Sequence, residues 1–276
     1  MSTEPRPLWL QFFFEITIMI DGERFAGGLE LNFFESSAFE EMQQDDSIEY
    51  YNSVGRNALR MLMMGWHDNW QQLLTWQLAK AVFIERDHKL TRGMRFAFQQ
   101  GFDHLFDQLQ GTHLTEQEQH QAELFLANCL TLLPYADITP YETFAIPQWV
   151  DGSWQKVDYK VVPIELTPTS GLKSLFIRDN DRVFAYGLEP ITHPTAESHL
   201  VFMGTTYPAG QGFSPQIATD MEAFETVGKK LYRSGHANIV KWLDSQAKPV
   251  HVCGTSLGGS LSLLLALITQ TMLPRQ

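Results

Sequence analysis

The sequence predicts a protein of the α/β class, in which an incomplete parallel sheet follows a mostly helical N-terminal region with a β-hairpin. Two short apolar strands in the second half are each followed by a segment of helical character, the order typical of parallel sheets. In the first half, apolar residues recur at helical spacings of three and four. We therefore expect residues 1–145 to form the N-terminal region and residues 146–276 the sheet-containing region.

Composition indicates a folded chain and narrows the classes of partner. Of its 276 residues, 44% are hydrophobic and 12% aromatic, which is enough to build a packed core. The formal net charge of −12 disfavours nucleic acid as a partner, because binding a phosphate backbone requires clustered Lys and Arg. It leaves neutral and lipidic ligands open.

The sequence has no pattern typical of secretion, membrane spanning or a disulfide framework. The N-terminus lacks the basic region and cleavage pattern of a secretory signal, and the apolar run at residues 261–268 is far below the ~20 residues that span a bilayer. Two cysteines, Cys129 and Cys253, fit a reducing compartment. We expect a cytoplasmic protein without a transmembrane segment, and export by a route without a signal is compatible with the same features.

The N-terminal region begins with a predicted hairpin and continues with predicted helices. Residues 8–20 are aromatic and β-branched, Asp21-Gly22 is a turn signal, and residues 25–34 are the expected returning strand. Amphipathic spacing predicts helices over residues 56–81, 92–109 and 115–133, the last opening with the capping-box pattern Thr115-x-x-Glu118. Their position before the sheet suits a lid or substrate-recruiting role. Because neither H-E-x-x-H nor a zinc-type Cys/His spacing occurs, we expect no metal.

The chain then returns to strand patterns. Pro140 and Pro147, with Pro134 just before them, predict a loop or linker over residues 135–147, and hairpins are expected around residues 151–153 and 180–181. Residues 199–203 read as a buried strand and residues 250–253 as a second one. Between these two strands we expect one helix from Ser214-Pro215 to about residue 231 and another over residues 237–247.

The second strand leads into a pattern that carries chemistry. Gly254-Thr255-Ser256-Leu257-Gly258-Gly259 lies between an extended run and an apolar helical segment, as in a G-x-S-x-G nucleophile elbow. Side chains at Gly254 and Gly258 are expected to collide with the neighbouring helix and strand. Ser256 is the candidate nucleophile. As a bare motif G-x-S-x-G also arises by chance, and Ser256 is then an ordinary turn residue.

The same stretch offers donors for an oxyanion. The amide of Leu257 directly follows the nucleophile, and the helix that begins there adds the positive end of its dipole. A second donor is expected in the loop after the earlier strand, where Thr205 stands in Gly204-Thr205-Thr206. Each such donor contributes roughly 3 kcal/mol of transition-state stabilisation.

These two segments resemble the α/β-hydrolase fold and, within it, the class 3 (fungal-type) lipases, over residues 172–276. That family has an apolar strand ending in Gly-Ser/Thr, an Asp on the next helix, matched by Asp220, and a G-H-S-L-G-G elbow. The resemblance implies a serine hydrolase without a cofactor that cleaves esters of apolar or lipidic acyl groups. It implies Ser256 as nucleophile with Thr205 and Leu257 as oxyanion donors. Thr255 stands where the family usually has His, which affects local packing.

The acid and base of the catalytic triad have no counterpart after Ser256. In this family the order is Ser, then Asp or Glu, then His, yet none of these three residue types follows Ser256. Three explanations stay open: a longer hydrolase of which this is the front part, a degenerate homologue acting as an interaction or ligand-binding module, or an accidental motif. We favour the first, with a C-terminal remainder as partner. Upstream histidines are remote substitutes for the base, with His251 expected in the buried strand and His193 and His199 bordering the other strand.

Overall fold

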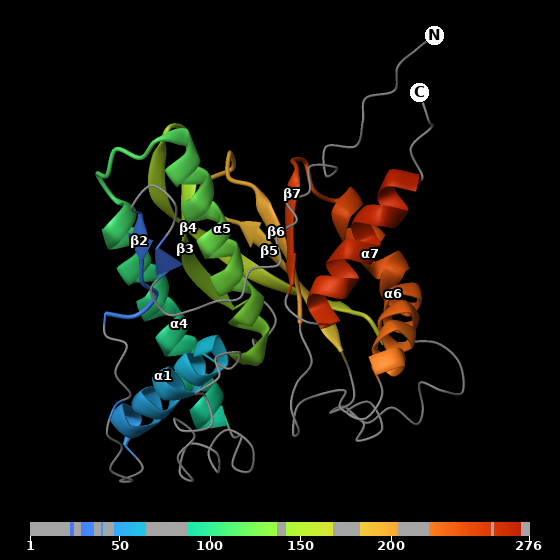
Figure 1. The fold of residues 1–276 in the computed structure, drawn as a ribbon, viewed down its shortest axis with the longest axis horizontal. Coiled ribbons are helices and arrows are strands. Elements are labelled where there is room, and N and C mark those ends of the chain that lie inside the picture. The colour runs from blue at the N-terminus through green and yellow to red at the C-terminus, as the bar shows by residue number, and fades with distance from the viewer. Residues whose placement is uncertain are drawn as a thin grey trace. The chain divides into compact units, whose positions relative to one another are not determined.

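The computed structural model describes residues 23–24, 29–35, 40, 47–64, 88–136, 142–167, 183–203, 221–254 and 257–271 (Figure 1). The chain divides into two compact units. The helical unit comprises residues 17–160 and 190–196, and the sheet unit comprises residues 1–16, 161–189 and 197–276. Strands β3 to β7 are ordered β3-β4-β5-β6-β7 in one sheet, and the division falls within β4. The protein is thus a mixed α/β structure.

Three helices dominate the described part of the helical unit: α1 (Ile48–Met64), α4 (His88–Leu109) and α5 (Glu116–Leu132). The second and third predicted helices are confirmed to within four residues at each end. The first begins earlier than predicted, at Ile48, and its continuation past Met64 lies beyond the described residues. The capping box of α5 is confirmed, because the Thr115 and Glu118 side chains each bond the other residue's backbone amide.

Helices α1 and α4 cross at a pair of glycines. A Cβ on Gly55 would lie 2.1 Å from the carbonyl carbon of Gly93, and a Cβ on Gly93 would lie 2.1 Å from the carbonyl oxygen of Tyr51. No heavier residue fits either position without moving a helix backbone. Further along α4, Phe33 lies against Gly101 and makes edge-to-face contacts with Phe98 and Phe102, and all three rings are buried.

The described N-terminal strands are short. β1 (Glu23–Arg24) pairs antiparallel with β2 (Glu30–Leu31), with Glu23 opposite Leu31. β2 lies within the predicted returning strand, while the predicted first strand, residues 8–20, lies in a part of the chain that the structure does not describe. A side-chain amide holds the residue after β2: Gln108 of α4 accepts from the amide of Asn32 at 3.0 Å and donates to its carbonyl at 2.7 Å.

The hairpin β3 (Thr143–Val150) and β4 (Ser153–Glu165) confirms the turn expected around residues 151–153. Asp151 and Gly152 have φ of 51° and 84°, as a two-residue hairpin turn with the twist of its strands requires. The loop predicted for residues 135–147 is wrong for residues 143–147, which belong to β3. Pro147 is accommodated because β3 is an edge strand, where no further strand needs its missing amide donor.

In the sheet unit, β5 (Phe184–Pro190) pairs antiparallel with β6 (Ser198–Phe202), and β6 pairs parallel with β7 (Val250–Gly254). The two predicted buried strands are therefore confirmed as a parallel pair, while the pairs β3–β4 and β5–β6 are antiparallel. The first strand of the hairpin predicted around residues 180–181 falls among residues that are not described.

One helix, α6 (Met221–Asp244), lies where the sequence predicted two. The prediction of separate helices up to residue 231 and from residue 237 is wrong, because α6 continues through Gly235. That glycine serves close packing: a Cβ there would lie 2.8 Å from Cα of Leu166. The predicted helix start at Ser214-Pro215 is not among the described residues.

Helices α6 and α7 (Leu257–Thr271) cover one face of the parallel pair and form its core. Trp242 of α6 lies over Gly187 of β5, where a Cβ would come within 2.4 Å of the indole, and its Nε1 donates to Glu189 at 2.9 Å. The buried side chains of this core come from both strands and both helices and include Leu200, Phe202, Val250, Val252, Ile239, Leu243, Leu261 and Leu265.

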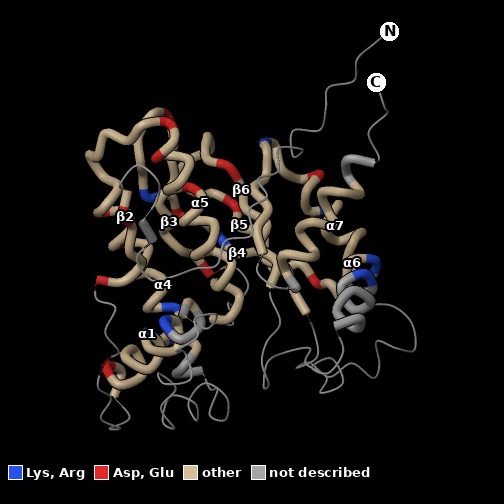
Figure 2. Tube along the Cα trace, viewed as in Figure 1, with Lys and Arg blue, Asp and Glu red and all other residues tan. Residues whose placement is uncertain are grey.

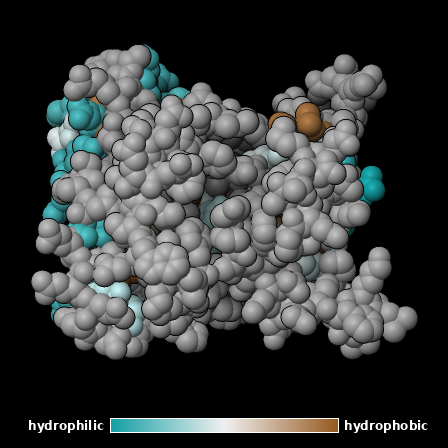
Figure 3. Space-filling view, turned by 60° about the horizontal axis from the view of Figure 1, so that its bottom comes forward, coloured by the Kyte–Doolittle hydropathy of each residue, from teal (hydrophilic) through white to brown (hydrophobic). Residues whose placement is uncertain are grey.

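Charges and exposed apolar groups are distributed over the described surface without one dominant run. In Figure 2 the described carboxylates are spread over several helices and strands. The coloured atoms in Figure 3 are mostly hydrophilic, with a small hydrophobic patch. The exposed large apolar side chains include Leu263 and Leu267 of α7. Among the described helices, none combines the length and the apolar character needed to cross a membrane.

Candidate functional site

The predicted elbow lies between β7 and α7. β7 ends at Gly254 and α7 begins at Leu257, so that two residues, Thr255 and Ser256, connect a strand to a helix. Both of these residues, and Thr205, belong to the parts of the chain that the structure does not describe. The described groups around them are the two flanking glycines, the start of α7 and the carboxyl end of β6.

The glycines on either side of the connection are tightly enclosed. A Cβ on Gly254 would lie 2.5 Å from the carbonyl carbon and oxygen of Gly258, across the turn. A Cβ on Gly258 would lie 2.3 Å from the carbonyl oxygen of Phe202 and 2.9 Å from that of Met203. Backbone atoms make all four of these contacts, so a side chain at either position requires the strand or the helix to move.

The first turn of α7 presents its amides to this turn. A helix has no internal acceptors for its first four N–H groups, and here these include the amide of Leu257. They form the positive end of the helix dipole, which favours negative charge nearby. Within the helix, the Ser262 hydroxyl donates to the Gly258 carbonyl at 2.9 Å, so this serine is committed to the backbone of its own helix.

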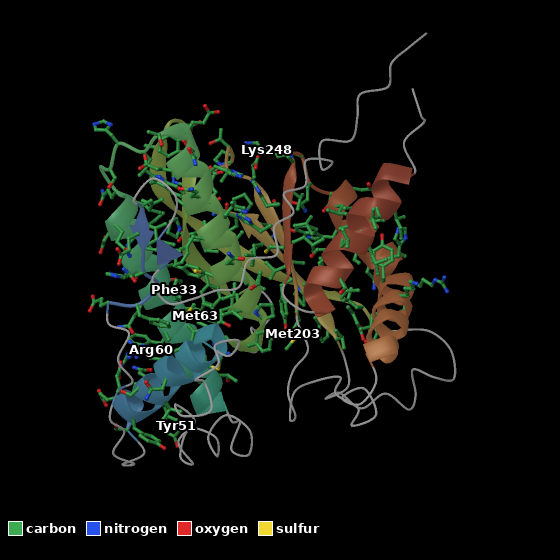
Figure 4. The ribbon with its side chains drawn as sticks, in the orientation of Figure 1. Phe33, Tyr51, Arg60, Met63, Met203 and Lys248 are labelled. Carbon is green, nitrogen blue, oxygen red and sulfur yellow. The ribbon has the colours of Figure 1, made fainter. Side chains whose placement is uncertain are left out.

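The carboxyl end of β6 is in contact with the same turn. Because β6 and β7 are parallel, with Phe202 opposite Gly254, both strands end side by side. The close approach of Gly258 to Phe202 and to Met203, which is labelled in Figure 4, brings the start of α7 against the end of β6. The segments that carry the two candidate oxyanion donors thus leave adjacent strand ends.

The histidines of β6 and β7 lie at the other end of these strands. His199 and His251 are partners in the parallel register, and their rings stack with centroids 5.2 Å apart and planes 26° apart. Each histidine lies three residues before the end of its strand, which is about 10 Å from Phe202 or Gly254. Figure 4 shows the two ends through Lys248, just before β7, and Met203, just after β6. Neither histidine is therefore at the strand ends that lead to the candidate elbow.

The histidine pair includes a carboxylate that sequence reasoning missed. Nε2 of His251 is in very close hydrogen-bonding contact with Oε2 of Glu197, the residue before β6. The hydrogen bond from His251 lowers the pKa of Glu197, burial opposes this shift, and the charges of His251 and Lys248 add to it. Burial, with a smaller effect of His251, lowers the pKa of His199 well below its usual value. Pairing the two predicted strands from their first residues would have set His199 opposite Val250, one residue out of the observed register, so the predicted strand bounds alone could not bring these groups together.

The remaining titratable groups near β7 do not add a catalytic group. Burial raises the pKa of the Cys253 thiol to about 12, so this cysteine is not a nucleophile at neutral pH. His236 of α6 lies with its ring 5.3 Å from that of Tyr232. His193 belongs to the helical unit. In the described part of the chain, no group of three or more His, Cys, Asp or Glu side chains is arranged to hold a metal ion.

Comparison of the chain with known protein families, with curated protein sequences and with solved structures finds no match.

Proposed function

We propose that the chain carries the nucleophile of a serine hydrolase of the lipase or esterase type, which cleaves carboxylic esters of apolar acyl groups through Ser256. In this reaction the Ser256 hydroxyl loses its proton to a base and attacks the ester carbonyl; the ester C–O bond breaks, the alcohol leaves with that proton, and an acyl-enzyme remains. Water then hydrolyses the acyl-enzyme, which releases the carboxylic acid and restores the Ser256 hydroxyl. The amides of Leu257 and Thr205 would stabilise the oxyanion of each tetrahedral intermediate.

One observation carries the proposal: the start of α7 packs without intervening side chains against the carboxyl end of the adjacent parallel strand. Gly258 approaches the carbonyl oxygens of Phe202 and Met203, and Gly254 approaches Gly258. This packing supports a tight strand-to-helix turn at Thr255-Ser256, with the amides of a helix N-terminus beside the serine.

Catalysis by Ser256 further requires a base and an acid from elsewhere. His199 and His251 lie about 10 Å from the strand ends at Phe202 and Gly254, so the base is expected from residues outside the described ones or from a further segment of the same hydrolase. The exposed leucines of α7, Leu263 and Leu267, offer such a segment an apolar helix face.

Active-site labelling tests the proposal. A fluorophosphonate probe is incubated with the longest natural form of the protein, its Ser256→Ala variant and a matched Ser260→Ala variant, because Ser260 is an exposed serine one turn into α7. We expect labelling of the wild type and of Ser260→Ala, and complete loss in Ser256→Ala. Absence of Ser256-dependent labelling in a folded protein would refute the hydrolase.

The position of the histidines favours a second candidate, a noncatalytic ligand-binding or interaction module of hydrolase ancestry. In that case the described strands contain no base near Ser256 because none is needed. The DNA that follows the codon for Gln276 separates the two candidates: a continuation encoding Asp and His supports the enzyme, and a stop supports the module.

A further inference from the structure

The amino ends of β6 and β7 hold a cluster of ionisable groups that the proposed hydrolase does not use. We call Glu197, His199 and His251 the latch residues. Glu197 precedes β6, His199 is the second residue of β6 and His251 the second residue of β7. Besides the backbone ladder, the Glu197–His251 hydrogen bond and the stacked histidine rings join the two strands here.

The two histidines lie on the face of the sheet that α6 and α7 do not cover. Side chains alternate along β6 and β7, so that Leu200 and Val252 face α6 and α7 while His199 and His251 face away from these helices. On β5, the residue opposite His199 is Leu188, which is fully buried and uncharged. The charged group that acts on Glu197 besides His251 is Lys248, in the turn before β7. Solvent reaches Glu197 and His251, with exposed side-chain fractions of 38% and 29%, but His199 is only 5% exposed.

We propose that Glu197, His199 and His251 form a proton-sensitive latch that keeps the amino ends of β6 and β7 paired at neutral pH and releases them in mild acid. The physical reason is that a positive charge on His199 is unfavourable in the closed cluster. A proton on His199 would be buried and would stack directly against His251. Opening the strand ends exposes His199 to water, where it accepts the proton freely.

The direction of the pH effect follows from the proton balance. The pKa of His199 is lowered in the closed state, so the open state binds more protons and opening is favoured as pH falls below the ordinary value of 6.5. Between pH 7.5 and 5.5 the opening equilibrium rises about tenfold. Glu197, with its lowered pKa, stabilises the closed state above its ordinary value of 4.5, and this contribution is lost only at lower pH. The two groups therefore act in separate pH windows.

Hydrogen exchange of the full chain tests the latch. Exchange at pH 7.5 and 5.5, corrected for the intrinsic rate, is compared for peptides covering β6 and β7 and for peptides covering α4 in the helical unit. We expect protection in β6 and β7 to fall about tenfold at pH 5.5, with little change in α4. Equal protection of β6 and β7 at the two pH values would overturn the proposal.

Variants identify the responsible group. His199→Leu should remove the fall in protection between the two pH values, while His236→Gln, a histidine of α6 in the same unit, should keep it. A fall of the same size in His199→Leu would overturn the proposal. If His199→Leu does not fold, Glu197→Gln serves as the second variant: protection at pH 7.5 should already be lower, because the carboxylate no longer holds His251, and unchanged protection there would count against the latch.

Discussion

The helical unit and the sheet unit use glycine in the same way for different purposes. In the helical unit, Gly55 and Gly93 let two helix backbones cross at a distance that no Cβ permits. In the sheet unit, Gly254 and Gly258 let a strand end, a turn and a helix start pack with equal closeness. The α1–α4 crossing carries no chemistry that we recognise. Close glycine packing alone therefore does not indicate a catalytic site.

What distinguishes the turn at residues 254–258 is its place between a parallel strand and a helix N-terminus. The helix crossing joins backbone groups that are already paired within α1 and α4, whereas the start of α7 has N–H groups without helical acceptors. Only the second arrangement offers free donors to a negatively charged oxygen. The helix amides at the start of α7, and not the flanking glycines, are therefore the feature that supports Ser256 as a nucleophile.

The largest effect is expected for Gly93→Ala, which places a methyl group 2.1 Å from the carbonyl oxygen of Tyr51. Helix backbone cannot yield as a flexible side chain can, so we expect the helical unit to lose about 3 kcal/mol of its free energy of unfolding. Urea denaturation followed by circular dichroism measures the change. The matched control is Gly111→Ala, where a Cβ meets nothing within 4 Å and only the positive φ of 72° is strained, at a cost of about 1 kcal/mol. Equal costs for the two would show that the crossing is looser than described.

A smaller loss, about 2 kcal/mol, is expected for Gly258→Ala. Its methyl group would lie 2.3 Å from the Phe202 carbonyl oxygen, at a strand end that can shift more easily than the middle of a helix. If the proposed hydrolase is correct, fluorophosphonate labelling of Ser256 should fall by more than the folded fraction does, because the Leu257 amide moves with Gly258. Labelling that follows the folded fraction would reduce Gly258 to a packing residue, like Gly93.

Local patterns predicted the elements whose signals are complete within a few residues. The capping box at Thr115 and Glu118, the turn at Asp151-Gly152 and the strand before Gly254 each depend on neighbours in sequence, and the structure has all three. The loop predicted up to Pro147 was wrong because proline is compatible with an edge strand, and edge position is a property of the whole sheet. The two helices predicted up to residue 231 and from residue 237 are one helix, α6, and Gly235 within it packs against Leu166, 69 residues earlier in the chain.

In the candidate site, too, the local features were predicted and the contacts between distant residues were not. A motif of six residues predicted the strand, turn and helix around Ser256, but the Glu197–His251 contact joins residues 54 apart in sequence and depends on strand register. Sequence placed His251 in a buried strand and His199 at the border of the other strand, as remote substitutes for the base; parallel pairing puts both histidines at the strand ends opposite to the candidate elbow.

The smallest effect concerns side-chain amides of the helical unit that bond backbone N–H and C=O groups which a neighbouring strand would otherwise pair. At three places in the described residues, one side-chain amide both donates to and accepts from the backbone of a single residue: Asn57 with Glu40, Gln99 with Ala145, and Gln108 with Asn32. At Ala145, Gln99 of α4 thus occupies backbone groups of the edge strand β3 with bonds of 3.0 and 3.1 Å.

Gln99→Ala should destabilise the helical unit by about 1–2 kcal/mol, because two partly buried backbone groups lose their partner. Gln110→Ala, an exposed glutamine just past α4, is the control and should change the free energy of unfolding by less than about 0.5 kcal/mol. Exchange of the Ala145 amide gives a more direct measurement, since it should lose protection in Gln99→Ala before its neighbours in β3 do. Unchanged protection at Ala145 would mean that Gln99 is not needed to protect the Ala145 amide. Side-chain amides would then not distinguish the helical unit from the sheet unit, whose strands β6 and β7 are held by backbone pairing.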